Sequence, residues 1–249
     1  MKDREVDVLL LAENQIPIAD LLLAINRGQG APFIPARILN EKVSIISRLP
    51  EGSIVPRRDY GGVSIQHLTP PVGRDILLVI AHLPSKLYAD DDDQSYFCAR
   101  IARMVETYEH QLGHSRTVIV GDLNMNPFEP GVAAADAFHG VMSRRLAQKL
   151  IRTVNGEERK YFYNPMWSRF GDHTLGPPGT YYYPSSGQVT FFWNMFDQVL
   201  LRPELLDCFR DEDLEVLTRA GSTNLLTASA TPDVDSASDH LPLLFQLHL

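Results

Sequence analysis

The chain has 249 residues, of which 44% are hydrophobic, so it can bury a substantial core and form one large domain. Its formal net charge of −8 excludes a protein that binds polyanions through a broad basic surface, because such binding needs many Lys and Arg contacts to phosphates. Two cysteines are too few for a disulfide framework, and we expect neither a membrane span nor a signal peptide. We therefore expect a soluble, cytoplasmic protein that contacts nucleic acid, if at all, only locally.

Apolar segments of strand length alternate along the chain with segments of helical spacing, which favours a mixed α/β architecture. Strands are predicted over residues 6–13, 43–48, 62–68, 76–83, 117–122, 196–201 and 241–249. Helices are predicted over residues 16–26, 94–112, 131–138 and 143–151. The acidic run at residues 90–93 is expected to cap the longest helix, because acids are favoured near a helix N-terminus.

Ionisable residues stand at the ends of four of the predicted strands. Glu13 closes the first strand, and His82 and Asp122 close two later ones. The pair Asp239-His240 directly precedes the last strand. Each residue alone has an ordinary structural explanation, since an acid after a strand is usually a turn or capping residue. Together they indicate a site, because open α/β sheets place their sites at strand ends.

Five motifs stand in a defined order over nearly the whole chain: LLLAEN with Glu13, IAHLPS with His82, VGDLNMNP with Asp122 and Asn124, FDQVLL with Asp197, and SDHLPLLFQL with Asp239 and His240. In order and spacing they resemble the endonuclease/exonuclease/phosphatase family, which is similar to deoxyribonuclease I. The resemblance implies a four-layer α/β/β/α sandwich, with two mixed β-sheets packed face to face and flanked by helices. It also implies a single catalytic domain over residues 1–249 that hydrolyses a phosphoester with metal-activated water.

The resemblance further implies a metal site and a histidine pair. Glu13 and Asp239 are expected to hold Mg²⁺ or Mn²⁺, because hard oxygen ligands suit these cations. Asp197 is expected to orient His240 and to stabilise its protonated ring. Asp197 lies in an apolar segment, where an unpaired charge is costly, and a histidine partner removes that difficulty.

The remaining motif residues are expected to act on water and phosphate. Asp122 would accept from the attacking water, and Asn124 would donate to a phosphate oxygen. His82 is suited to protonating the leaving oxygen, and its presence disfavours an apurinic endonuclease of the type that carries Tyr at this place. Whether His240 or Asp122 is the general base stays open.

One departure from the family concerns its first strand, which carries an Asn close to the metal and precedes the strand ending at Glu13. Only a few residues precede residues 6–13 here, so we expect no counterpart of this strand in the given sequence. We expect the native start to lie upstream, because a missing strand would leave an exposed sheet edge. A longer chain should then melt higher and bind Mg²⁺ more tightly, and equal values for both lengths would contradict this. The alternative is an incomplete site in a catalytically weak binding module.

The predicted substrate is DNA or RNA, and the alternative is a small-molecule or lipid-headgroup phosphoester. Aromatic residues gather over residues 160–167 and 179–193, where Trp193 could stack on a base or pack a hairpin of the sandwich. Arg57 and Arg58 could hold phosphates, although neighbouring surface arginines are usually solvated. The sequence contains no evident Lys/Arg cluster for a substrate with several phosphates.

Overall fold

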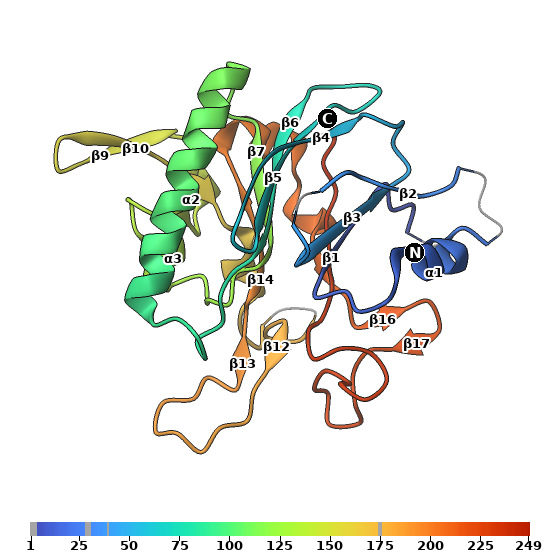
Figure 1. Ribbon diagram of the computed structural model, residues 1–249. Helices are drawn as coiled ribbons and strands as arrows, with labels where there is room; N and C mark the ends of the chain where they lie inside the picture. Colours follow the sequence, from blue (N-terminus) through green and yellow to red (C-terminus); the bar gives the residue numbers. More distant parts are fainter. Residues whose placement is uncertain (1–3, 28–30, 39, 174–175) are drawn as a thin grey trace.

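A seven-stranded mixed sheet forms the centre of the computed structural model, which describes residues 4–27, 31–38, 40–173 and 176–249 (Figure 1). Its strands run in the order β4-β5-β6-β7-β14-β11-β8. The bounds are β4 (Ile54–Tyr60), β5 (Val63–Leu68), β6 (Ile76–His82), β7 (Thr117–Asp122), β8 (Gly140–Val141), β11 (Phe162–Tyr163) and β14 (Asp197–Leu201). β6 and β7 are parallel, and β14 pairs with β7 in the antiparallel sense.

A smaller sheet packs against one face of the large sheet, in the order β1-β3-β2 (Figure 1). Its strands are β1 (Val8–Ala12), β2 (Ile34–Pro35) and β3 (Val43–Ser47), and their pairings are antiparallel. β1 is an edge strand of this sheet. The predicted face-to-face sandwich is confirmed, since residues of both sheets share one hydrophobic cluster.

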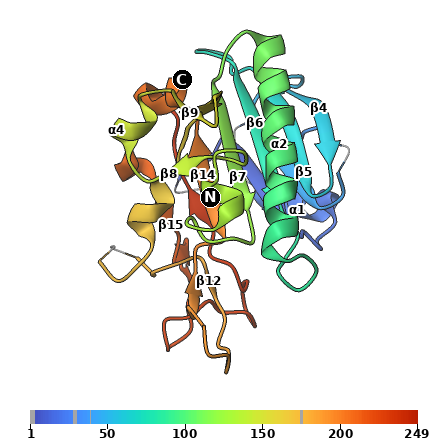
Figure 2. The ribbon, with the colours of Figure 1, turned by 90° about the vertical axis from the view of Figure 1, so that its left-hand side faces the viewer.

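Helix α2 (Asp91–Leu112) covers the other face of the large sheet (Figure 2). Asp90 caps it, because its side chain accepts from the backbone N–H of Asp93, as the acidic run predicts. Helix α1 (Ile18–Ile25) lies outside the smaller sheet (Figure 1). The two shorter predicted helices form only single turns, α3 (Pro130–Ala133) and α4 (Arg144–Ala147). Three 3-10 helices follow, η1 (Pro165–Arg169), η2 (Pro203–Cys208) and η3 (Asp211–Asp213).

The other strands form short two-stranded pairs: β9 (Ile151–Val154) with β10 (Glu157–Lys160), β12 (Tyr181–Tyr182) with β13 (Trp193–Asn194), β15 (Glu215–Val216) with β18 (Leu243–Leu244), and β16 (Arg219–Ala220) with β17 (Thr223–Asn224). The strand predicted over residues 241–249 is therefore regular only at β18. Its alternate apolar residues still pack on the core between the sheets, which explains the strand-like pattern. No helix within the described residues is both long and apolar enough to cross a membrane.

Alternation along the central strands divides the core into two layers. In β6, Ile76, Leu78 and Ile80 face the smaller sheet, whereas Leu77 and Val79 face α2. Both faces of β6 are buried, so its sequence is a continuous apolar run instead of an alternating one. This division decides where the polar residues at the strand ends point.

Candidate active site

Three polar side chains from neighbouring strands form a row at one end of the large sheet. The register pairs His82 of β6 with Asp122 of β7, and Asp122 with Asp197 of β14. Ile80 and Val120 stand two residues before His82 and Asp122, and Val199 stands two residues after Asp197; all three belong to the core between the two sheets. Since strand side chains alternate and adjacent strands lie about 4.8 Å apart, all three polar groups face the smaller sheet.

Glu13 enters this row from the smaller sheet. It follows β1 directly and has a left-handed backbone, with a φ of 50°. This conformation interrupts the alternation of side chains along the strand. Residues other than glycine rarely adopt it, and those that do are concentrated at functional sites. The Glu13 carboxylate is 74% exposed, and its Oε1 lies 3.3 Å from His82 Nε2. The same His82 nitrogen lies 3.8 Å from Asp122 Oδ2, so the two sheets meet at this histidine.

His240 and Asp197 form the predicted pair. His240 Nδ1 and Asp197 Oδ2 are 2.8 Å apart. The Tyr181 ring lies against the imidazole, with 4.7 Å between the ring centroids, and the two residues also form a β-bridge. Because Nδ1–H donates to the carboxylate, the proton position is set and Nε2 is left for a substrate or water.

The site gives its histidines and carboxylates different proton affinities. Burial alone would lower the pKa of His240, but the hydrogen bond and charge of Asp197 outweigh it and raise the pKa to about 9. Burial, followed by the charge of Asp197, raises the pKa of Asp122 to about 7. Burial lowers the pKa of His82, and the charge of Glu13 opposes this only in part. The pair of Asp197 and His240 thus favours the protonated form of His240. The neighbouring Asp122 carboxylate gains or loses its proton near neutral pH.

Asn124 has a different environment from the predicted one. Its side-chain Nδ2 donates to Asp122 Oδ2 at 2.8 Å and to the Leu83 carbonyl at 3.0 Å. Its backbone N–H donates to Asp122 Oδ1, and its φ is 50°. An amide has two N–H donors, and both are engaged here. Asn124 therefore orients the Asp122 carboxylate, and in this arrangement no N–H remains for a phosphate oxygen.

The donor set at this edge fits a divalent cation. Asp239 is exposed, and its charge acts on both Tyr181 and His240. Among the residues that the structure describes, Glu13 forms an ion pair only with His82. Four carboxylates, those of Glu13, Asp122, Asp197 and Asp239, thus gather around two histidines. An excess of oxygen anions of this kind is what Mg²⁺ prefers.

The three predicted substrate contacts from outside the motifs are not brought into this row. Arg57 lies on β4, and its guanidinium donates to His67 Nδ1 at 2.9 Å, toward the opposite end of the sheet. Arg58 is exposed on the same strand, which is an edge of the large sheet and separated from β7 by two strands. Trp193 is half-buried against the core and packs edge-on against Tyr182. The structure therefore gives Arg57 a structural partner and Trp193 a packing role.

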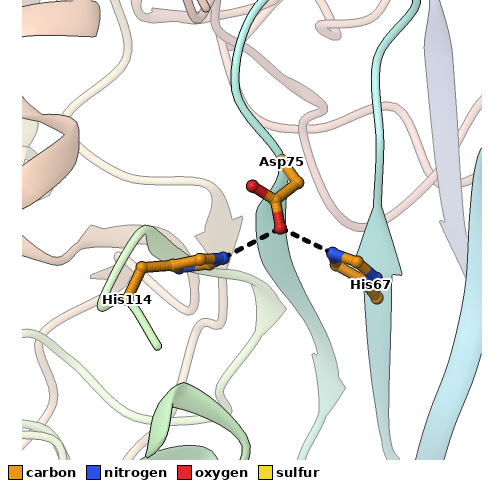
Figure 3. A group of neighbouring side chains, drawn as sticks. All are labelled: His67, Asp75 and His114. Carbon is orange, nitrogen blue, oxygen red and sulfur yellow. Dashed lines mark hydrogen bonds and ion pairs between the residues drawn. The ribbon is translucent and has the colours of Figure 1, made fainter. Parts of the chain in front are cut away.

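A second histidine cluster lies at that opposite end of the sheet (Figure 3). His67 Nε2 and His114 Nε2 lie 2.8 and 3.1 Å from the same Asp75 oxygen, Oδ2. Asp75 precedes β6, at whose other end His82 lies. The Arg116 guanidinium also binds Asp75. Burial would raise the pKa of Asp75, but the hydrogen bonds from His67, His114 and Arg116 lower it well below its ordinary range.

The hydrogen bonds of this cluster oppose metal binding. His67 Nδ1 accepts from Arg57, and His114 Nδ1 accepts from the backbone N–H of Arg116. Both neutral rings must therefore carry their proton on Nε2, where it is donated to Asp75. If a metal were bound to Nε2 of either ring, the ring proton would have to move to Nδ1. There it would point at the N–H group of Arg57 or Arg116 that now donates to that nitrogen. The cluster accordingly holds a carboxylate and is not the metal centre.

Other residues of the site carry no motif that distinguishes them in the sequence. Thr180 Oγ1 accepts from the backbone N–H of Asp197, and Tyr181 covers His240. Buried Gln94 of α2 donates to the Asn124 carbonyl. These residues are far apart along the chain from the groups they support, so only the folded backbone reveals their contacts.

This chain is similar to known proteins in its fold, whereas the sequence comparisons found no relative. No protein-family model matches it. No curated protein matches it significantly in sequence. Among solved structures, the 2′,3′-cyclic phosphatase ANGEL2 is similar with a TM-score of 0.56 and 18% identity, over 98% of this chain and 82% of ANGEL2. Truncated Caenorhabditis elegans TDP2 is similar with a TM-score of 0.50 and 14% identity, over 96% and 84%. The chain therefore shares the fold of these two proteins, which confirms the mixed α/β sandwich that the motifs predicted.

Proposed function

We propose that the protein is a metal-dependent phosphodiester hydrolase that acts on DNA or RNA. The observation that carries this proposal is the convergence of Glu13, His82, Asp122 and the Asp197–His240 pair at one sheet edge. Carboxylates next to imidazoles of different proton affinity are the groups that water attack on a phosphoester requires. The 2′,3′-cyclic phosphatase ANGEL2, which shares the fold, supports the class by analogy only.

Glu13 and Asp239 are the residues that would hold Mg²⁺ or Mn²⁺. When bound, the cation would neutralise charge on the phosphate and on the leaving oxygen. The exposure of both carboxylates supports this role, since an Mg²⁺ site keeps several waters and uses one or two protein carboxylates.

Asp122 and His240 divide the proton and charge tasks in this proposal. Asp122, with a pKa near 7, is matched to accept a proton from the attacking water. His240, kept protonated by Asp197, would donate from Nε2 to a phosphate oxygen and stabilise the negative charge that develops there. His82 stands beside Glu13 and would deliver a proton to the leaving oxygen. Asn124 keeps Asp122 in place.

Residues 1–249 are proposed as one catalytic domain, since both hydrophobic clusters use residues of the same central strands. Cys98 and Cys208 are both free, which supports the cytoplasmic assignment.

The test is hydrolysis of plasmid, single-stranded DNA, RNA and bis-p-nitrophenyl phosphate in Mg²⁺, Mn²⁺ or EDTA. We expect turnover that needs the cation and that His240→Ala lowers by about 10²-fold or more. His248→Ala is the matched control, because His248 forms a 2.8 Å pair with Asp213 away from the site. Turnover of the small ester alone would contradict nucleic acid as substrate. Absence of cation-dependent turnover on every substrate would contradict the hydrolase.

A further inference from the structure

The β12–β13 hairpin projects from the body of the protein beside the candidate active site (Figures 1 and 2). β13 ends at Asn194, three residues before Asp197 opens β14. The hairpin base is tied to the loop after β7, because Asn126 donates to the Asn194 side chain and accepts from the Met195 backbone. Its position relative to the catalytic residues is therefore set by hydrogen bonds.

Aromatic rings lead outward along this hairpin from His240. Tyr181 contacts the His240 ring, and Tyr183 follows two residues later with its ring within 9° of parallel to that of Tyr181. Residues i and i+2 of a strand share a face, so both rings lie on the side of His240. Phe192 is hydrogen-bonded to Tyr183 through the backbone, but its ring stacks on that of Tyr182 and so lies on the opposite face of the hairpin. Tyr183 is 55% exposed and Phe192 47% exposed.

Phe192 is held in an unfavourable conformation. Its φ of 60° lies in the left-handed region, which a bulky side chain rarely adopts. The ring is 47% exposed and contacts the Tyr182 ring, with 6.4 Å between the centroids, so it is not enclosed by packing. Strain of this kind concentrates where a side chain is presented to a ligand.

The composition of the hairpin indicates what its exposed rings would contact. Its tip, residues 184–188, reads PSSGQ and is polar, so it is poorly suited to insertion into a bilayer. Flat rings beside a phosphoester site instead match nucleobases, each of which has a π face. A protein of net charge −8 gains little from long-range attraction to a polyanion, so stacking would have to supply much of the affinity.

We propose that Tyr183, which continues outward from Tyr181, and Phe192, on the other face of the hairpin, form a stacking surface for unpaired bases next to the scissile phosphate, and that the substrate is single-stranded nucleic acid. This inference rests on the proposed function, which it narrows to one class of substrate. A duplex keeps its bases paired and stacked on one another, so it cannot offer their faces to Tyr183 and Phe192 without opening.

The test is binding of a fluorescent single-stranded oligonucleotide in EDTA, measured by anisotropy and compared with an oligonucleotide of the same backbone that carries abasic residues. We expect the abasic strand and a matched duplex to bind about tenfold more weakly. Tyr183→Leu and Phe192→Leu keep apolar bulk but remove the rings, and each should reduce the preference for the base-bearing strand. Val189→Ala, an exposed apolar position on the same hairpin, should leave the preference unchanged.

Equal binding of base-bearing and abasic strands by the wild-type protein overturns the stacking surface. Retained preference in both Leu variants overturns it as well, provided that their melting temperatures match the wild type. Capture by phosphatidylcholine vesicles that Tyr183→Leu abolishes, without any oligonucleotide preference, would assign the rings to a lipid surface. Hydrolysis of bis-p-nitrophenyl phosphate separates the two proposals: a stacking preference without hydrolysis contradicts only the hydrolase, and hydrolysis without a preference contradicts only the stacking surface.

Discussion

Asp122 and Asp197 are carboxylates on adjacent strands that their surroundings prepare for different tasks. Asp197 accepts from His240, whereas Asp122 accepts from Asn124 and is raised in pKa by burial and by the charge of Asp197. Two like charges facing each other across one strand spacing resist ionising together. The pKa values of Asp122 and His240 therefore both depend on Asp197, and substitution of Asp197 would change both.

Asp75 makes a residue-scale prediction about stability. Its carboxylate accepts from His67, His114 and Arg116, so Asp75→Asn should lower the free energy of unfolding by about 2 kcal/mol near neutral pH. The pKa of Asp75 is lower in the folded protein than its ordinary value of 3.8. Its stabilisation is therefore fully present above that value and is lost as the pH falls toward the folded pKa.

Urea unfolding of both proteins between about pH 7 and pH 3 checks this prediction. The stability difference should stay constant from neutral pH to about pH 5 and shrink below about pH 4. A difference that grows on acidification would have the wrong sign. Because the cluster holds no metal in our interpretation, any shift that Zn²⁺ causes in the melting temperature should be the same in the wild-type protein and in Asp75→Asn.

At the scale of elements, the contact between β6 and β7 aligns His82 with Asp122. Gly121, the residue before Asp122, is paired with Ala81. A Cβ at Gly121 would lie 2.0 Å from the Ala81 carbonyl oxygen, and its φ is 136°. The two strands can approach this closely only because the glycine has no side chain.

Gly121→Ala should therefore destabilise the protein by about 3 kcal/mol or more and reduce hydrolysis, because the strand ends must separate. Gly156→Ala is the matched control. Gly156 also has a positive φ, of 83°, but a Cβ there would meet no atom within 4 Å. We expect it to cost only about 1 kcal/mol and to leave activity unchanged. Chemical denaturation and ester hydrolysis measure both effects, and equal losses in the two variants would contradict the steric explanation.

At the scale of the whole molecule, net charge should govern how salt affects substrate binding. With a formal charge of −8 and no broad basic surface, the protein should neutralise only about two phosphates. Affinity for a single-stranded oligonucleotide should then fall by only about tenfold when the salt concentration rises fourfold. Anisotropy titrations over a salt series give the slope of log affinity against log salt. A slope steeper than about −5 would show many phosphate contacts and contradict local binding.

Local patterns in the sequence determined the strands β1, β6, β7 and β14 and the helix α2. They also determined the polar residue at the end of each strand that lies in the candidate active site. These features were predictable because a strand buried on both faces must be apolar, and the first polar residue marks its end. The motifs also indicated the pairing of Asp197 with His240. Short strands such as β16 and β17 were missed, because two-residue segments carry no periodic signal.

Only the tertiary structure decided what each polar residue faces. The register of β6, β7 and β14 aligned His82, Asp122 and Asp197, and the left-handed backbone turned Glu13 toward them. The tertiary structure also places the Arg57 guanidinium against His67 and not in the candidate active site. The roles of Asn124 and Tyr181 depend on partners that are distant in sequence or on the direction of a side chain. Composition and spacing determine which segments are buried, but hydrogen-bond partners are determined by how strands from distant parts of the chain pair.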